Sequence, residues 1–335
     1  MSSIARRILR WTGKALLWLV VALLALAVVG VIYQAVATER AEHAHPPPGE
    51  LVDVGGDSLH INCVGQGRPT VVLEAGSGSM SANWANVQPE IAKTTRVCAY
   101  DRAGMGWSEP GPKPRDARQI SGELHTLLEG ANIEGPYVLV GHSTGGLHAR
   151  MYADRYSDEV AGVVLVDSSH PEQFTRSAEG HKYYEPTKRV VVVAPWLARL
   201  GVIRLFDLNP APHGLPQQQR AQVEAFNPST QQLATAVEEF RAITETMAQV
   251  RATGSLGDKP LAVVSAGDRL PGSFSASYWL KLQDELAALS SKSSHRVVDG
   301  ATHDSLLSER RDARVTSATI LKVVGAVRND QPLDL

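Results

Sequence analysis

The residues best suited to do chemistry form a short glycine-flanked segment, Gly141-His142-Ser143-Thr144-Gly145. The apolar run Tyr137–Gly141 before it is typical of a buried strand, and a helical pattern follows from Thr144. A sharp strand-to-helix turn lifts a serine hydroxyl clear of both elements, and a Cβ on either flank would collide with the neighbouring backbone. The segment therefore predicts that Ser143 is a catalytic nucleophile; the alternative is a turn whose small residues only pack a helix onto a sheet.

A nucleophilic serine needs a histidine base to take its proton. Where the serine lies on such a turn, the acid and then the histidine follow it along the chain. We expect the base to be His303, which lies just beyond the last predicted strand, Arg296–Val298. His295 precedes that strand and His170 lies much earlier, so both are less well placed.

The base in turn needs an acid that orients its ring. Asp268 follows the predicted strand Leu261–Val264 and satisfies the chain order, so it is the expected acid. The alternative is Asp167, directly after the predicted strand Val160–Val166.

An acyl-transfer reaction also needs two N–H groups to hold the oxyanion. One should come from Thr144, the residue after the nucleophile, and the other from the glycine-rich loop that follows the predicted strand Thr70–Leu73. In that loop we choose Ser77 as the second donor, and we expect Gly76 and His142, beside the two donors, to contact substrate.

These residues require a scaffold, and the chain alternates strand and helix patterns from Leu51 onward. Besides the strands above, apolar runs predict strands at Leu59–Val64 and Arg96–Tyr100, and helical patterns cover Ala85–Lys93, Arg118–Gly130, Thr144–Tyr156 and Ser277–Leu289. Such alternation favours a mostly parallel sheet covered by helices on both faces. Residues 51–169 and 259–330 should form this α/β core, and the helix-prone segment 170–258 an inserted helical cap.

The N-terminal region carries an apolar segment of 24 residues, Ala15–Thr38, without a charged residue or histidine. As a helix it is long enough to cross a bilayer core of about 30 Å. Basic residues in segment 1–14 precede it, so the positive-inside rule places that segment in the cytoplasm and the body on the other side. The alternative is a cleavable signal peptide, for which Ala35-Val36-Ala37 would be the cleavage site. Residues 39–50, with three consecutive prolines, should form a linker that behaves as a solvated tether.

Composition excludes several other classes of protein. The 335 residues include 33 Lys and Arg against 35 Asp and Glu, a net charge of −2, which argues against nucleic-acid binding. A hydrophobic fraction of 43% argues against disorder. Two cysteines are too few for a disulfide scaffold or a structural zinc site.

The chain from Leu51 to about Val327 resembles the α/β-hydrolase family. Besides the serine turn, the segment Tyr100 to Ser108 is similar to the family's D-R-x-G-x-G-x-S turn, and Trp84 matches a recurrent tryptophan for which we expect substrate contact. The resemblance implies an eight-stranded, mostly parallel sheet, a helical cap and a serine esterase or lipase that needs no metal or organic cofactor. It also makes the strands carrying Cys63 and Cys98 neighbours, so these cysteines could form a disulfide in an exported domain. Many relatives begin the oxyanion loop with His-Gly, where this chain has Glu74-Ala75-Gly76.

The resulting hypothesis is a membrane-anchored, exported serine hydrolase that cleaves carboxylic esters with short-to-medium, apolar acyl chains. An amide or peptide hydrolase similar to proline iminopeptidases is the first alternative, with acidic cap residues to grip a substrate amine: Glu172, Glu179, Glu185, Glu238 and Glu239. The second is a ligand-binding protein without turnover. Epoxide hydrolases and dehalogenases of the family carry Asp at the turn, so Ser143 argues against both.

Overall fold

A computed structural model describes residues 3–269 and 274–333 of the chain. Its centre is an eight-stranded sheet with the strand order β1-β2-β4-β3-β5-β6-β7-β8. Strands β1 and β2 run antiparallel to their neighbours and the other pairs are parallel. The strands are β1 Glu50–Asp53, β2 Ser58–Val64, β3 Thr70–Glu74, β4 Val97–Tyr100, β5 Tyr137–His142, β6 Val160–Val166, β7 Leu261–Ala266 and β8 Ser293–Val298. The expected mostly parallel, eight-stranded sheet is confirmed.

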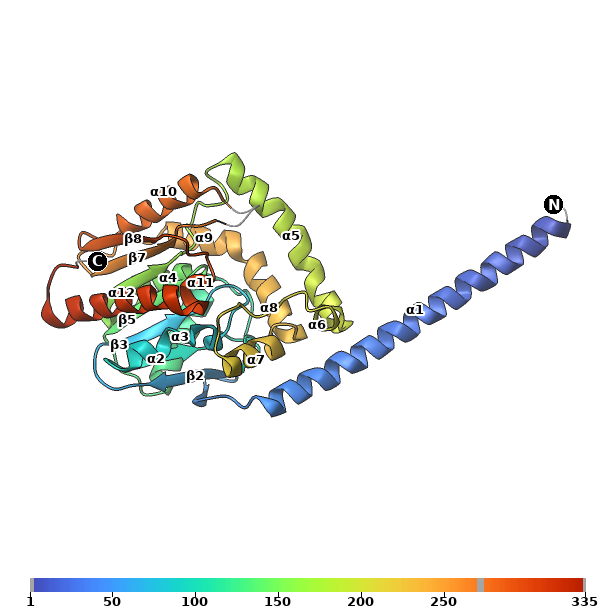
Figure 1. Cartoon of the computed structure of the whole chain (residues 1–335), viewed down its shortest axis with the longest axis horizontal. Coiled ribbons are helices and arrows are strands. Elements are labelled where there is room, and N and C mark those ends of the chain that lie inside the picture. The colour runs from blue at the N-terminus through green and yellow to red at the C-terminus, as the bar shows by residue number, and fades with distance from the viewer. Residues whose placement is uncertain (1–2, 270–273, 334–335) are drawn as a thin grey trace.

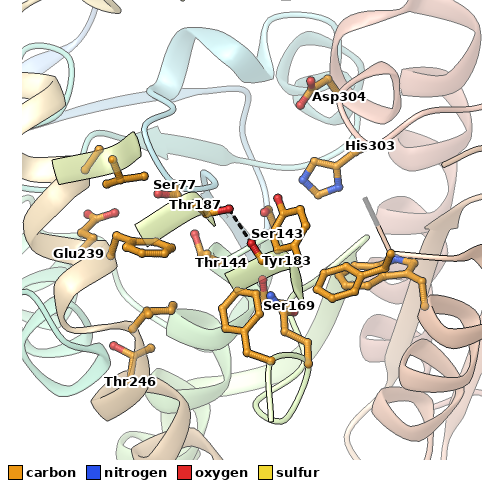
Figure 2. A pocket seen from close by; sticks show the side chains of 18 of the residues that line it. Ser77, Ser143, Thr144, Ser169, Tyr183, Thr187, Glu239, Thr246, His303 and Asp304 are labelled. Atoms are coloured by element: carbon orange, nitrogen blue, oxygen red, sulfur yellow. Dashed lines mark hydrogen bonds between the residues drawn. The ribbon is translucent and has the colours of Figure 1, made fainter. Parts of the chain in front are cut away.

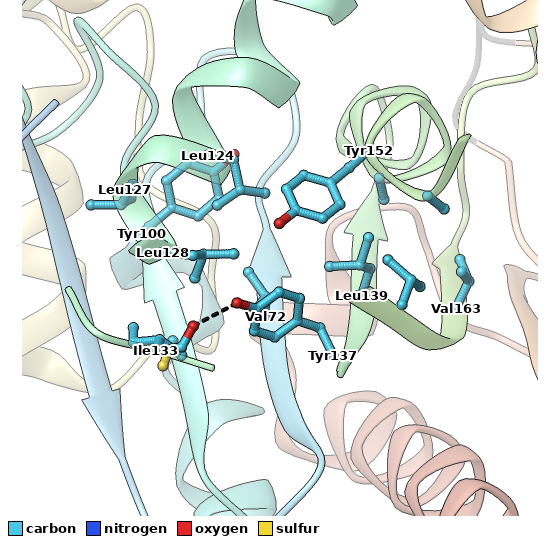
Figure 3. Close-up of a cluster of buried hydrophobic side chains, with 14 of the residues drawn as sticks. Val72, Tyr100, Leu124, Leu127, Leu128, Ile133, Tyr137, Leu139, Tyr152 and Val163 are labelled. Carbon is cyan, nitrogen blue, oxygen red and sulfur yellow. Dashed lines mark hydrogen bonds between the residues drawn. The ribbon is translucent and has the colours of Figure 1, made fainter. Parts of the chain in front are cut away.

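Successive residues of the central strands enter two different hydrophobic clusters, because side chains alternate between the faces of a sheet. In β5, Leu139 packs on one face and Val138 and Val140 pack on the other. Figure 3 shows the first cluster, in which Leu139 and Tyr137 face Leu124, Leu128 and Tyr152 from two helices. Burial on both faces explains why these strands read as continuous apolar runs in the sequence.

Helices cover both faces of the sheet (Figure 1). On one side lie α3 Ala117–Gly130, α4 Gly145–Arg155 and α10 Ala276–Ala287, and on the other lie α2 Gln88–Ala92 and α12 Arg310–Asn329. Short helical turns precede α2, β6 and α12: η1 Ser81–Trp84, η2 Ser157–Glu159 and α11 Ser305–Ser308. Helix α12 and strand β1 were not among the elements expected from the patterns.

The inserted segment between β6 and β7 is helical, as expected. It contains α5 Ala178–Arg199, α6 Val202–Leu205, α7 Gln217–Phe226, α8 Thr230–Arg241 and α9 Ile243–Arg251. Its last helix is attached to the core, because Thr246 and Gln249 of α9 accept the N–H groups of Ala117 and Arg118 at the start of α3. The cap is therefore fixed at α9, while α5 crosses the open end of the sheet (Figure 1).

The N-terminal helix α1, Ser3–Ala44, is 42 residues long and extends away from the body (Figure 1). It continues six residues beyond the expected end at Thr38 and stops before Pro46, because a residue that precedes proline is disfavoured in a helix. The following segment is not the solvated tether that we expected. The Nε1–H of Trp107 donates to the carbonyl oxygen of His45 at 2.7 Å. The ring of His60 forms a hydrogen bond with the carbonyl oxygen of Pro48.

Cys63 of β2 and Cys98 of β4 lie directly opposite each other in the sheet and form a disulfide. This is the pairing implied by the resemblance. It links residues that are 35 positions apart in the sequence.

Candidate active site

Ser143 occupies a strained turn between β5 and α4. Its φ of 56° lies in the left-handed region, which costs energy for a residue other than glycine. The surrounding glycines permit the turn: a Cβ on Gly145 would lie 2.5 Å from the carbonyl oxygen of Glu74, and one on Gly141 would lie 2.5 Å from Gly146 Cα. Packing around these glycines therefore holds the backbone in the conformation that presents the Ser143 side chain to the cavity (Figure 2).

His303 lies in the loop between β8 and α11 and reaches the same cavity as Ser143 (Figure 2). Its Nδ1 donates to Oδ2 of Asp167 at 2.5 Å, which leaves Nε2 free to accept a proton. The ring also packs against that of His142, with ring centroids 4.4 Å apart, and the backbone carbonyl of His303 accepts a hydrogen bond from His142 Nε2. These contacts fix both the position and the tautomer of the imidazole.

Asp167, rather than the expected Asp268, is the acid that contacts His303. Asp167 directly follows β6, and its side chain is fully buried. Its Oδ1 accepts from Trp279 Nε1 at 2.7 Å and from the backbone N–H of Ala266 at 3.1 Å, and Arg269 lies 2.9 Å from Oδ2. Four donors thus surround one carboxylate.

Asp268 lines the cavity but is exposed, and it makes no hydrogen bond with His303. Strand β7 ends at Ala266, and the next residues turn toward the loop after β8, where the Asp268 N–H donates to the carbonyl oxygen of Ala301. The expectation that Asp268 is the partner of His303 was therefore wrong. Asp167 also lies between Ser143 and His303 in the chain, so the chain order did not distinguish the two aspartates.

The contact shifts the pKa values of both residues. Burial by itself raises the pKa of Asp167, but the hydrogen bond and charge of His303 and the charge of Arg269 outweigh it, and the pKa is held well below the usual range. Burial by itself lowers the pKa of His303, yet the bond to Asp167 and its charge raise it above the ordinary value. Asp167 thus favours the protonated form of the His303 ring.

Ser77 and Thr144 both line the cavity next to Ser143, as expected for oxyanion donors (Figure 2). Neither backbone N–H group is used in the turn and loop hydrogen bonds of the described residues. Gly76 also lies close to Ser143, because a Cβ at this position would be 3.0 Å from Ser143 Cβ. Only a glycine leaves room here for a substrate carbonyl between the loop and the serine.

A buried arginine holds the loop that carries Ser77. Arg102 donates to the carbonyl oxygens of Ala75 at 2.6 Å and Gly76 at 2.8 Å. It also pairs with Glu74, at the end of β3, and with Glu239 of cap helix α8, each at 2.8 Å. Since a peptide C=O and the following N–H point in opposite directions, the bond to Gly76 turns the Ser77 N–H away from Arg102.

The D-R-x-G-x-G-x-S turn that contains Arg102 was recognisable in the sequence, but no functional role was expected for this arginine. The sequence did contain one signal for such a role: Glu74 stands in the segment where many relatives have His-Gly, and a buried carboxylate requires a cationic partner. For Arg269 and Trp279, which complete the surroundings of Asp167, we find no local signal in the sequence.

The cavity has a volume of about 370 Å³, at the small end of the range for ligand sites. Core and cap both line it: Ser143, His303 and Ser77 come from the core, and Tyr183, Thr187 and Glu239 come from the cap (Figure 2). Much of the remaining lining is aromatic or aliphatic: Phe174, Val191, Ala236, Phe240, Ile243, Phe274 and Trp279. The lining suits an apolar group next to Ser143.

The three residues expected to contact substrate do not line the cavity: Gly76, His142 and Trp84. Trp84 is fully buried in the core, where its ring meets that of His142 edge-on at 6.4 Å. His142 lies behind His303, and burial lowers its pKa to about 3, so it stays neutral. The rings of Trp84, His142 and His303 thus pack in sequence behind the cavity.

The other two histidines considered as bases have different partners. His295 bonds to Ser265 and Asp284, both at 2.7 Å. His170 lies 3.5 Å from Glu285, and burial lowers its pKa to about 4.

The family model described as "alpha/beta hydrolase fold" matches residues 69–227. An uncharacterized protein of Schizosaccharomyces pombe is 26% identical over 295 residues, which cover 78% of this chain and 53% of that protein. An uncharacterized vacuolar membrane protein of Saccharomyces cerevisiae is 32% identical over 132 residues, which cover 34% of this chain and 20% of that protein.

Among solved structures, a thermophilic esterase from Thermogutta terrifontis superposes with a TM-score of 0.61 and 20% identity, covering 82% of this chain and 98% of the esterase. At this identity the likeness concerns the fold alone. The sheet topology and the match to this family model show that the chain has the α/β-hydrolase fold. The chain spans about half the length of the S. pombe relative, and much less of the yeast membrane protein.

Proposed function

We propose that the protein is a membrane-anchored serine hydrolase that cleaves carboxylic esters through Ser143, His303 and Asp167. The observation that carries this proposal is the buried Asp167 carboxylate, whose bond to His303 Nδ1 orients the imidazole toward the cavity that holds Ser143. Acyl transfer by a serine requires a nucleophile, a base and an acid that orients the base.

In the proposed reaction, His303 Nε2 takes the proton of Ser143 as Oγ attacks the ester carbonyl carbon. The N–H groups of Ser77 and Thr144 stabilise the oxyanion, and His303 then gives its proton to the leaving alkoxide. Water, deprotonated by His303, attacks the acyl-enzyme in turn, and the proton returns to Ser143 as the acid is released. Asp167 stays ionised throughout.

The cavity lining supports esters with short-to-medium, apolar acyl groups. Its volume of about 370 Å³ is small, and Phe174, Phe240 and Ile243 offer apolar contact area.

Most of the acidic cap residues that could bind a substrate amine already form ion pairs or hydrogen bonds with other residues. Glu239 lines the cavity but pairs with Arg102, Glu172 pairs with Arg176, and Glu238 pairs with Lys113 and Arg241. Glu179 accepts hydrogen bonds from Ser275. We therefore favour ester over aminoacyl amide substrates.

Two features support an anchored body in an oxidising compartment. Within α1, residues Arg10–Ala44 are apolar enough to cross a membrane, with a mean hydropathy of 3.0 in the most apolar window. The second feature is the Cys63–Cys98 disulfide, because disulfides persist in extracytoplasmic compartments and are rare in the cytosol. With the basic residues before α1's apolar part on the cytoplasmic side, the body would be exported.

Labelling with a fluorophosphonate tests this proposal, since the probe reacts only with an activated serine. The full chain in detergent, read by intact mass, should gain one adduct, whereas Ser143→Ala and His303→Ala should gain none. A folded wild-type protein that gains no adduct would refute the mechanism and favour a ligand-binding role. Esters are then screened first and aminoacyl amides second, and a clear preference for amides would refute the substrate class.

A further inference from the structure

An exposed apolar surface lies on the cap, at the end of α5, on α6 and just after it. Outside α1, 11 large apolar side chains are exposed among the described residues, and seven of them fall between positions 192 and 208. We call these seven the cap ridge: Val192, Val193, Trp196, Leu200, Leu205, Phe206 and Leu208. Trp196 is 63% exposed and Leu205 and Phe206 are each 65% exposed, so water would meet large apolar groups here.

The cap ridge adjoins the N-terminal helix. A Cβ on Gly30 of α1 would overlap the backbone carbonyl of Leu200, and a Cβ on Gly201 would lie 2.8 Å from the ring of Tyr33. Gln34, one turn along α1, is buried and donates to the carbonyl oxygen of Pro228 at 2.9 Å. The contact is thus made through backbone-to-backbone approach and a buried hydrogen bond, and Figure 1 shows α6 beside α1.

The position of this contact along α1 sets its depth in a bilayer. Lys14 is the last basic residue before the apolar segment, and Gly30 follows it by 16 residues. At about 1.5 Å per residue this separation is about 24 Å along the helix, less than the thickness of the hydrocarbon core of about 30 Å. If Lys14 lies at the cytoplasmic boundary, Leu200 and Gly201 lie at or just inside the opposite boundary.

We propose that the cap ridge inserts into the membrane leaflet nearest the hydrolase body, so that the protein holds the bilayer with both α1 and its cap. This inference rests on the proposed function for the identity of α1 as an anchor. The side chains fit a lipid interface: the Arg199 guanidinium stacks over the Trp196 ring at 5.0 Å, and Lys188 and Arg189 are exposed on α5. Aromatic rings and cations of this kind prefer the headgroup region, with aliphatic groups below them.

The proposal also bears on the class of substrate. Helix α5 connects the ridge to the cavity, because Tyr183, Thr187 and Val191 of the same helix line the space around Ser143. A substrate dissolved in the leaflet would meet the cap within a few helical turns of the cavity. The preferred substrates should therefore be single-chain esters that partition into membranes.

A depth measurement on the full chain in phosphatidylcholine–phosphatidylglycerol vesicles tests the insertion. Cys63 and Cys98 are disulfide-bonded, so an environment-sensitive fluorophore reacts with a single introduced cysteine. Phe206→Cys reports on the ridge, and Val297→Cys on β8, also exposed, is the matched control. With doxyl-labelled lipids, we expect several-fold stronger quenching at position 206 than at 297, and a blue-shifted emission at 206 alone.

Equal quenching at the two positions would overturn the proposal. A label at 206 that escapes lipid quenching but shows energy transfer between copies would also overturn it, in favour of a dimer that covers the ridge. This readout needs no turnover, so it decides the insertion even if the proposed ester hydrolysis fails.

A second measurement tests delivery of the substrate. The double variant Leu205→Ser/Phe206→Ser should lose about tenfold or more in turnover of a long-chain monoester held in vesicles, while its turnover of a water-soluble short-chain ester stays within about twofold. Val64→Ser/Val297→Ser removes exposed apolar groups from the body and should change neither rate. A parallel loss on both esters, or no loss on either, would refute delivery through the ridge.

Discussion

Substituting Asp167 by asparagine tests the geometry of the proposed active site most directly. All four polar partners of the Asp167 carboxylate are donors: His303, Arg269, Trp279 and the N–H of Ala266. An asparagine has one oxygen and one NH2 group, so either orientation of the amide places a donor against two donors. If the NH2 group faces His303, the imidazole shifts its proton to Nε2 and can no longer accept one from Ser143.

The size of the expected loss follows from this change of tautomer. Replacement of the acid in serine–histidine–aspartate triads lowers kcat by about 10⁴-fold, and we expect a loss of about 10³- to 10⁴-fold here. At about 1.4 kcal/mol per factor of ten, this equals about 4–5.5 kcal/mol in the activation barrier. Arg269 also loses its buried partner, so we expect the variant to be less stable, by about 3–5 kcal/mol.

The assay compares Asp167→Asn with Asp268→Asn, since both aspartates follow a strand but only one contacts the histidine. The readouts are the rate of fluorophosphonate labelling and the hydrolysis of a short-chain ester, with thermal unfolding to confirm that each variant is folded. Asp268 is exposed, so its substitution should leave folding intact and activity within about twofold. A loss of a hundredfold or more in Asp268→Asn would refute the assignment even if Asp167→Asn failed to fold.

Three further outcomes are expected. The rising limb of kcat/KM against pH should lie above the ordinary histidine pKa, because Asp167 raises the pKa of His303 and the base acts only when neutral. The Arg269→Met variant should move this limb to still higher pH, since the guanidinium lowers the pKa of His303. An unchanged limb in this variant would contradict the expectation. Arg102→Lys should lower kcat about tenfold with KM nearly unchanged, because a lysine cannot bond to the carbonyl oxygens of Ala75 and Gly76 while it also pairs with Glu239. A change in KM alone would instead indicate a role in binding. Replacing both Cys63 and Cys98 by alanine should lower the free energy of unfolding by about 2–4 kcal/mol, measured by urea denaturation with and without reductant, and a reductant-insensitive wild type would argue against the bridge.

The sequence determined the sheet scaffold and the identities of two of the proposed catalytic residues. Ser143 was recognisable because its function depends on a local motif, a buried strand followed by glycines and a helix. His303 was recognisable because the loop after the last predicted strand returns to the same edge of the sheet. Most strands were predictable because burial on both faces demands unbroken apolar runs. Strand β1 was missed, since only one of its four residues is buried.

Only the tertiary structure decided which aspartate serves His303. Asp167 and Asp268 both follow buried strands, and the local sequence does not encode the direction in which the chain leaves the sheet. At Asp167, a left-handed φ of 41° and four donors from distant parts of the chain hold the carboxylate inward. At Asp268, the backbone N–H bonds to Ala301, and the side chain is exposed.

The same limit applied to the residues around the site and to the linker. Trp84 and His142 have side chains that suit either a core or a ligand site, and their burial depends on helices and loops far along the chain. The linker after α1 looks like a tether, yet its carbonyl oxygens bond to Trp107 and His60. Local patterns report the backbone conformation and the burial of each strand, whereas the partners of a side chain are chosen by long-range packing, which no single segment contains.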